Sequence, residues 1–502
     1  MADNRATVLK GGTVLLHDED DRVKPRTVDV LIQGSVIVKI ECNIESVDAE
    51  IIDCSDSIIS PGFVDTHHHV YQTQFKGVHA DQTLAEFAAH GTSGNFIAKY
   101  FSPSDVFWGQ LSGCMEMVDG GTTTVVDYAH VNPSLEYNYA AISATEASGI
   151  RSIFCHFAMA TVSNWETFSV DFEILRDHTA TLEKLLAGEP YAQGRVNIGF
   201  AYDGWAWMPK QYLTWLKSQL DALSVRLITA HHWWRDCEGA RPTTLEVLHE
   251  HGMLDKRWLI AHANNMPPSD AALIKANGAH VASTPSTELQ LSMGFPIIAY
   301  RKDLGITDIC SLGVDCQSFT CAYLPGEARM ALQSARAARG EPWLQKGKVM
   351  RDVGYLVEES FNLATILGAR AAKMEDKVGS IAVGKFADLV IFKKSSPGMV
   401  CASIQNPVAA IMLHSSPADV EAVMIGGIFR KRDGKLLPVR LEGHGQKVAG
   451  RDELSWAEVA SAVVRSKLAF ESRTRDVNME QETKKAEFVY YGPNAQDILT
   501  SG

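Results

Sequence analysis

The sequence predicts an α/β protein: a (β/α)8 TIM-like barrel with a small β-sandwich domain built from both chain ends. Between residues 61 and about 370, short apolar runs alternate with helix-length stretches, and there are eight such runs. This alternation is typical of a parallel barrel with right-handed crossovers. The residues before and after this region form short strand-like runs separated by turns, without helical periodicity.

The expected elements divide the chain into four parts. Residues 1–60 and 371–440 are expected to pair in one β-sandwich, residues 61–370 to form the barrel, and residues 441–502 to form a helical tail. Helical spacing of apolar residues in the tail predicts a helix docked on the domain or on a partner subunit. Helices are expected between the barrel strands, for example over residues 105–121 and 269–278. The eight expected barrel strands are residues 61–70, 122–130, 151–159, 195–204, 226–232, 257–263, 279–285 and 308–315.

Composition narrows the class of protein. A chain of 502 residues is long enough for a barrel of about 250 residues and a second unit. Its net charge of −13 argues against a nucleic-acid partner. The sequence has no signal-peptide pattern and no apolar run of membrane-spanning length, so we expect a cytoplasmic protein without a membrane partner. Nine cysteines without CxxC pairs fit reduced thiols.

Possible metal ligands stand at the ends of several expected strands. Because side chains alternate along a strand, His67 and His69 point to one face and His68 to the other. His231, His262 and Asp315 end three later strands. A parallel barrel places the carboxyl ends of all its strands on one face, so these side chains are expected to converge. The pattern predicts a metal site at the mouth of the barrel.

The motifs PGFVDTHHH, ITAHH, LIAHAN and SLGVDC resemble the metal motifs of the amidohydrolase superfamily, in the branch of cytosine deaminases and atrazine chlorohydrolase-like enzymes. The segment KVGSIAVGKFADLVIF resembles the family's return to the β-sandwich. By this resemblance His67, His69, His231 and His262 bind the metal, and Asp315 is a ligand or the base that takes a proton from water. The resemblance also implies a homo-oligomer, a dimer or a tetramer.

The metal count follows from the same resemblance. Members with two metals usually carry a carboxylated lysine at the end of the fourth strand, and residues 195–204 contain no lysine. One divalent metal ion is therefore expected, with zinc favoured and iron as the alternative, because imidazole suits both.

The expected function is that of a metal-dependent hydrolase. Metal-activated water would cleave a non-peptide C–N bond in a small molecule: a cyclic amide, an amidine or an amino-heterocycle. The deaminases of this branch typically carry a glutamate three residues after the histidine of the fifth strand, where this chain has Trp234. That departure keeps a metal-dependent decarboxylase or lyase on the same barrel open as an alternative. A catalytically inactive scaffold is the other alternative, although the complete set of four histidines and one aspartate argues against it.

Glu288 is the candidate for the missing acid. It lies just past the seventh expected strand, where it could replace the usual glutamate or hold a cationic group of the substrate. The alternative is a purely structural carboxylate at a helix N-terminus, favoured there by the helix dipole.

Five further residues are candidates for substrate binding. His130 and His156 end the second and third expected strands, and Trp205 and Trp233 lie in the loops after the fourth and fifth. Gln74 follows the first strand, at a position that resembles substrate contacts in relatives. The alternative roles are structural: hydrogen bonding for the histidines and packing at the barrel rim for the tryptophans.

Overall fold

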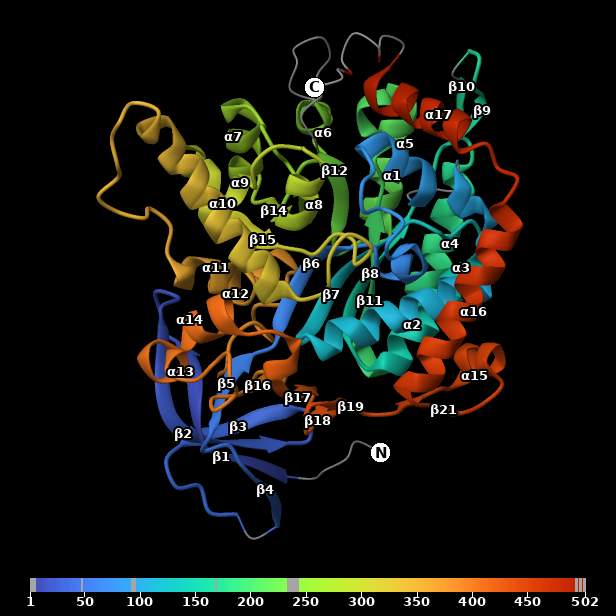
Figure 1. The fold of residues 1–502 in the computed structure, drawn as a ribbon. Coiled ribbons are helices and arrows are strands. Elements are labelled where there is room, and N and C mark those ends of the chain that lie inside the picture. The colour runs from blue at the N-terminus through green and yellow to red at the C-terminus, as the bar shows by residue number, and fades with distance from the viewer. Residues whose placement is uncertain are drawn as a thin grey trace.

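The computed structural model describes residues 6–46, 48–91, 96–167, 169–232 and 243–492, together with residues 495 and 499. A sheet made from both ends of the chain lies below the barrel in Figure 1, and the last helices run along one side of the barrel to its top. No helix among the described residues combines the length and apolar character needed to cross a membrane.

The centre of the molecule is a sheet of eight parallel strands, paired with their neighbours in chain order. Backbone hydrogen bonds from Asp315 N to His67 O (2.9 Å) and from His69 N to Asp315 O (2.6 Å) connect its last and first strands. The expected barrel is therefore confirmed. Its strands are β6 (Phe63–His68), β7 (Thr122–Ala129), β8 (Arg151–Phe157), β11 (Val196–Ala201), β12 (Ile228–His232), β13 (Trp258–His262), β14 (His280–Ser283) and β15 (Cys310–Leu312).

Helices follow these strands, and several of them start at residues that cap the helix N-terminus. Ser102 and Asp105 form a capping box at the start of α2, with Ser102 N donating to Asp105 Oδ2 at 2.8 Å. The predicted helices over residues 105–121 and 269–278 correspond to α2 and α7. The helices of this region are α1 (Leu84–Gly91), α2 (Pro103–Asp119), α3 (Leu135–Ser148), α4 (Leu175–Ala187), α5 (Lys210–Ala222), α6 (Thr244–Glu250), α7 (Pro268–Ala276), α8 (Pro285–Gln290), α9 (Ile297–Tyr300), α10 (Leu324–Leu344), α11 (Val357–Leu363) and α12 (Ile366–Ala371).

The second sheet joins the two ends of the chain, as expected. Strand β5 pairs antiparallel with β16, which brings Ile59 opposite Ile391. One apolar cluster contains residues from both ends, such as Val14 and Met424. The residue limits of the predicted units stay predictions. The strands are β1 (Ala6–His17), β2 (Val23–Gln33), β3 (Val36–Glu41), β4 (Ala49–Asp53), β5 (Ser57–Pro61), β16 (Leu389–Lys393), β17 (Val420–Ile425), β18 (Ile428–Arg432) and β19 (Lys435–Leu436).

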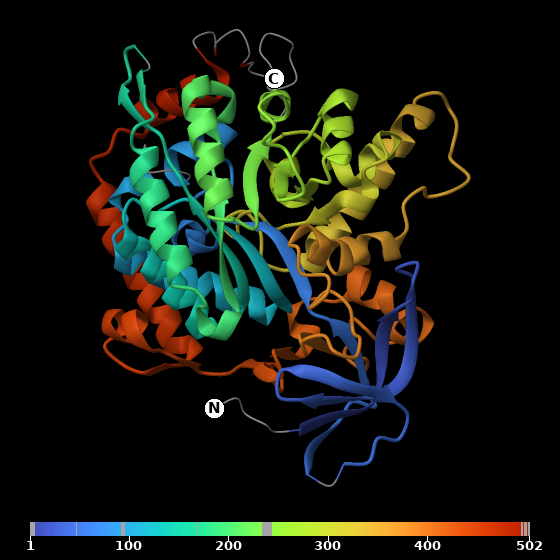
Figure 2. The same cartoon turned by 180° about the vertical axis from the view of Figure 1, so that it is seen from behind.

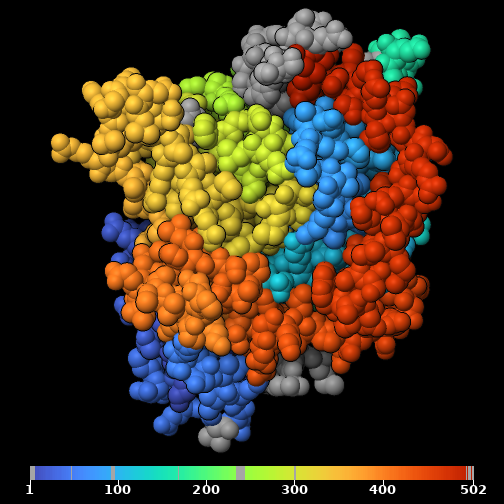
Figure 3. Space-filling view, in the orientation of Figure 1, coloured from blue at the N-terminus to red at the C-terminus, as the bar shows by residue number. Residues whose placement is uncertain are grey.

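The C-terminal segment is helical and packs on the barrel's helices. Ser466 on α16 donates a hydrogen bond of 2.7 Å to Asp105 on α2, and α17 packs beside α1. Figure 2 shows these helices from behind, and Figure 3 shows their surface beside the segment that contains α1. The remaining elements are β9 (Thr161–Asn164), β10 (Ser169–Asp171), α13 (Ala402–Gln405), α14 (Pro407–Ala409), β20 (Val439–Arg440), α15 (Gly443–Ala449), β21 (Glu453–Leu454), α16 (Trp456–Thr474) and α17 (Met479–Tyr491).

Candidate metal centre

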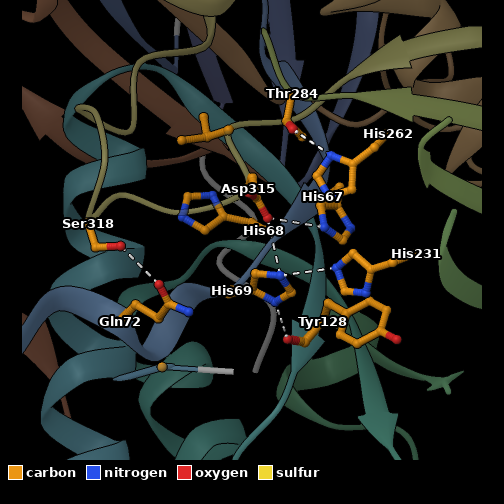
Figure 4. Close-up of polar contacts among 12 residues, drawn as sticks. His67, His68, His69, Gln72, Tyr128, His231, His262, Thr284, Asp315 and Ser318 are labelled. Atoms are coloured by element: carbon orange, nitrogen blue, oxygen red, sulfur yellow. Dashed lines mark hydrogen bonds and ion pairs between the residues drawn. The ribbon is translucent and has the colours of Figure 1, made fainter. Parts of the chain in front are cut away.

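Four side chains meet at the carboxyl end of the barrel strands. One possible ligand atom from each of His67, His69, His231 and Asp315 lies within 4.8 Å of the others. Asp315 Oδ1 is 3.3 Å from His67 Nε2 and 3.2 Å from His69 Nε2. Figure 4 shows these side chains pointing toward one another. Barrel closure therefore brings together residues that are up to 248 positions apart in the chain.

The backbone of β6 separates His68 from this cluster. Its Nδ1 lies 2.8 Å from Asp65 Oδ2, and its Nε2 lies 2.7 Å from Gln317 Oε1. Both ring nitrogens are thus used on the opposite side of the strand, as strand alternation predicts. Burial disfavours the charged ring, but the charge and hydrogen bond of Asp65 outweigh it and raise the pKa of His68.

The hydrogen bonds of two histidines fix which nitrogen carries the proton. His69 Nδ1 lies 2.9 Å from the carbonyl oxygen of Tyr128, and His231 Nδ1 lies 3.1 Å from both carboxylate oxygens of Asp203. Carbonyl and carboxylate oxygens only accept, so both Nδ1 atoms donate and both Nε2 atoms keep a lone pair. These Nε2 atoms are 3.3 Å apart. Two lone pairs facing each other beside a carboxylate fit a bound cation.

Asp203 is a functional candidate that the sequence analysis missed. It follows β11, and it accepts hydrogen bonds from Tyr128 Oη at 2.6 Å and from the backbone N–H of His231 at 2.9 Å. Burial acts to raise the pKa of Asp203, but the charge and hydrogen bond of His231 prevail and lower it. The signal for Asp203 in the sequence is a carboxylate at the end of the fourth expected strand.

His262 lies beside the cluster but outside the group of four. Its ring is stacked against that of His231, with centroids 5.4 Å apart. Its Nδ1 is 3.0 Å from Thr284 Oγ1 and 3.6 Å from Glu288 Oε1. The predicted role of His262 as a metal ligand stays a prediction.

Glu288 is buried behind His262. Its carboxylate accepts hydrogen bonds from Thr284 N at 2.7 Å and from Ser283 Oγ at 2.9 Å, at the start of α8. Glu288 is fully buried and does not line the cavity above the cluster. This position suits a carboxylate that orients His262 and Thr284. A direct catalytic role for Glu288 stays a prediction.

A cavity of about 290 Å³ opens above the four-residue cluster, and His130 is part of its wall. The ring of His130 stacks on that of His69, with centroids 4.1 Å apart. Its buried Nδ1 makes no hydrogen bond to any described residue. Burial and the neighbouring histidines hold the pKa of His130 well below its usual value, so the ring is neutral. A neutral imidazole of this kind can bind a polar group of a ligand.

The other predicted substrate contacts lie elsewhere. His156 is buried, with Nδ1 2.8 Å from Asn138 Oδ1, and Trp205 is buried against Trp258. Gln74 donates a hydrogen bond of 2.8 Å to the carbonyl oxygen of Asp105. None of His156, Trp205 and Gln74 lines the cavity. Trp233 lies outside the described residues.

Comparisons with known proteins agree with this arrangement. The model of the Amidohydrolase family matches residues 58–208 and 229–435. A 5-methylthioadenosine/S-adenosylhomocysteine deaminase from Pyrococcus abyssi is 25% identical over 457 residues, which cover 86% of this chain and 96% of that protein. A 5'-deoxyadenosine deaminase from Methanosphaera stadtmanae is 26% identical, with 88% of this chain and 97% of that protein covered.

Solved structures show the same fold. An adenosine deaminase from Xanthomonas campestris with bound zinc has a TM-score of 0.73 at 18% identity, and 94% of this chain and 99% of that chain are covered. An atrazine chlorohydrolase from Arthrobacter aurescens, complexed with zinc, also has a TM-score of 0.73, at 19% identity. In that comparison 91% of this chain and 100% of that chain are covered.

Proposed function

This chain belongs to the amidohydrolase family, and from that premise we propose that it removes an amino group from a small amino-heterocycle by hydrolysis at one metal centre. The protein is a hydrolase that acts on C–N bonds of small molecules. The observation that carries the proposal is the cluster of His67, His69, His231 and Asp315, whose possible ligand atoms lie within 4.8 Å of one another.

We propose that these four residues hold a single divalent ion, zinc by preference and iron as the alternative. Bound there, the ion would act as a Lewis acid and lower the pKa of water to about 7. Asp315 would accept the proton of the attacking water, because its Oδ1 lies at the centre of the cluster. His262, held through Nδ1 by Thr284, would present its other nitrogen to the reacting group.

The proton for the leaving nitrogen needs a source other than the usual glutamate. Asp315 can fill this role by returning the proton that it took from water, since one carboxylate can act first as base and then as acid. Glu288 lies behind His262 and would act only through that ring. The alternative of a decarboxylase gains no support from the relatives described above, which are named as deaminases and a chlorohydrolase.

An ammonia-release assay tests this proposal. The metal-loaded protein is incubated with 5'-methylthioadenosine, 5'-deoxyadenosine and diamino-1,3,5-triazines, and metal content is measured by elemental analysis. We expect ammonia from at least one of these compounds and about one metal ion per chain. Ammonia from none of them, with carbon dioxide released from a carboxylated ring, would favour the decarboxylase. If the protein purified without added metal contained no metal ion, the catalytically inactive scaffold would be favoured.

We also propose that the protein is a homodimer or homotetramer of the cytoplasm. Exposed apolar side chains on one helix support association: Trp456, Val464 and Leu468 on α16 are 41%, 55% and 59% exposed. The eight cysteines among the described residues are free thiols, which suits a reducing compartment. Light scattering on the purified protein would test the oligomer, and a monomer would contradict it.

A further inference from the structure

The cavity above the cluster has two unlike sides. The inner side carries the polar groups, among them His69, His231 and Asp315. The outer side is apolar, and includes Phe87, Phe96, Phe172, Leu291 and Val489. A few polar groups facing a mostly apolar wall are typical of a site that fixes one end of a ligand and buries the other.

Three segments far apart in the sequence form the roof of this apolar side: α1, the β9–β10 hairpin and α17. Figures 1 and 2 both show them together at the top of the barrel. Lys485 Nζ on α17 lies 5.4 Å from the centre of the Trp165 ring, beside the hairpin. Phe96 and Trp165 have ring centroids 6.0 Å apart, and Ala486 joins the same apolar cluster. Val489 and Tyr490 of α17 then line the cavity itself.

Charge restricts what this cavity can hold. Among the described residues that line it, none is a lysine or an arginine, and the carboxylates are those of Asp203 and Asp315. Against the apolar lining formed by the described residues, a carboxylate or phosphate of a ligand would lose its water without gaining a lysine or arginine partner, which is costly. Transfer of an uncharged apolar group from water into this part of the cavity is favourable.

We propose that the substrate is a neutral amino-heterocycle that carries an aryl or alkyl substituent, and that α17 completes the apolar subsite for this substituent. The identity of the reacting end rests on the function proposed above. α17 lies beyond residue 435, where the match to the family model ends. The subsite therefore depends on a part of the chain that this match does not include.

Calorimetric titration of the full-length, metal-loaded protein tests the subsite with three ligands that share one reacting ring. These are 2,4-diamino-1,3,5-triazines with a methyl, a phenyl or a 4-carboxyphenyl group at position 6. The phenyl compound should bind about tenfold or more tightly than the methyl compound, which corresponds to about 1.4 kcal/mol. The carboxyphenyl compound should lose that advantage. Equal affinity of the three, tighter binding of the carboxylate, or no binding at all would overturn the inference.

Variants of Val489 test whether α17 causes the preference for the phenyl compound. Val489→Asp should weaken phenyl binding by about tenfold and leave methyl binding within about twofold. Val489→Ala is a milder second variant, and should weaken phenyl binding by a few fold. Lys484→Ala is the matched control, because Lys484 lies on the same helix with its side chain 69% exposed. If both Val489 variants keep the full phenyl preference while folding normally, α17 does not form the subsite.

Ammonia release from the same triazines separates the two proposals. The expected binding order without ammonia from any compound would contradict the proposed function and leave the apolar subsite standing. Ammonia release with no preference for the phenyl compound would contradict the subsite and leave the function standing.

Discussion

Asp203 holds the imidazole of His231 through both carboxylate oxygens, each 3.1 Å from Nδ1. The same carboxylate accepts the backbone N–H of His231 and the hydroxyl of Tyr128. The ring is thereby fixed in orientation and in tautomer, with Nε2 turned toward His69. In metal sites such an outer carboxylate commonly strengthens the ligand that it orients.

Replacing Asp203 by asparagine should weaken metal binding. The amide can offer an N–H group to Nδ1, which favours the tautomer with the proton on the wrong nitrogen. We expect metal affinity to fall by about 10- to 100-fold, as measured by competition with a chelator. The side chain of Asp203 is 38% exposed, so the thermal midpoint of the apo protein should change little.

Tyr128→Phe is the control for Asp203→Asn. It removes the 2.6 Å hydrogen bond to Asp203 and keeps both contacts of Asp203 with His231. Its effect on metal affinity should therefore be smaller. Unchanged affinity in Asp203→Asn would show that the carboxylate does not support the metal ligand.

His69→Ala and His262→Ala should differ in metal content. His69 contributes to the group of four, whereas His262 lies outside it. We expect His69→Ala to lose its metal, and His262→Ala to keep most of its metal but lose turnover. Elemental analysis of both variants, purified side by side without added metal, decides between the roles. Equal metal loss in the two would establish His262 as a ligand.

Asp315→Asn should stop the reaction without unfolding the protein. The amide keeps the size of the side chain and one oxygen, but it cannot take a proton from water. We expect the rate of ammonia release to fall by about 10²- to 10⁴-fold, as for the loss of a general base. A metal-loaded variant with full activity would remove Asp315 from the proposed proton route.

Glu327 predicts a pH dependence of stability. Burial raises its pKa from 4.5 to about 8, although Ser286 N donates a hydrogen bond to its carboxylate at 2.8 Å. A raised pKa in the folded state means that the folded protein holds this proton more tightly, so stability falls as pH rises from about 4.5 to about 8. The slope contributed by one group is at most about 1.4 kcal/mol per pH unit.

Glu327→Gln should remove this contribution, because glutamine accepts the same hydrogen bond without titrating. Thermal midpoints are measured for both proteins between pH 5 and pH 8, in otherwise equal buffers. The thermal midpoint of the variant should increase relative to that of the parent protein as pH rises. A constant difference across this range would show that Glu327 does not titrate there in the folded protein.

The barrel and its strand ends could be predicted because they depend on local pattern. Alternation along β6 separates His67 and His69 from His68, and parallel pairing brings later strand ends to the same face. Roles that depend on tertiary contacts could not be predicted from the sequence. Asp203 orients His231 through tertiary hydrogen bonds, and Trp205 is in the core because Trp258 packs against it. The position of Val489 at the cavity follows from the packing of α17 on α1, which no local pattern reveals.

Gly313 controls how closely β15 approaches β6. A Cβ atom at this position would lie 2.5 Å from His67 O and 2.7 Å from His67 N, both of them backbone atoms that cannot move aside. Gly313→Ala should therefore push the two strands apart and displace the His67 ring from the cluster. We expect a loss of about 1–3 kcal/mol in stability, as for other overpacked sites, together with weaker metal binding.

Gly340→Ala is the matched control for this substitution. Gly340 lies inside α10, and a Cβ atom there would meet nothing within 4 Å. Alanine in that position should raise stability by up to about 1 kcal/mol and leave metal content unchanged, because alanine is the better helix former. Thermal midpoints and metal content are measured for both variants. If Gly313→Ala kept the thermal midpoint and the metal content of the parent protein, the two strands would accommodate a Cβ atom at this point. The position of His67 would then not depend on the glycine.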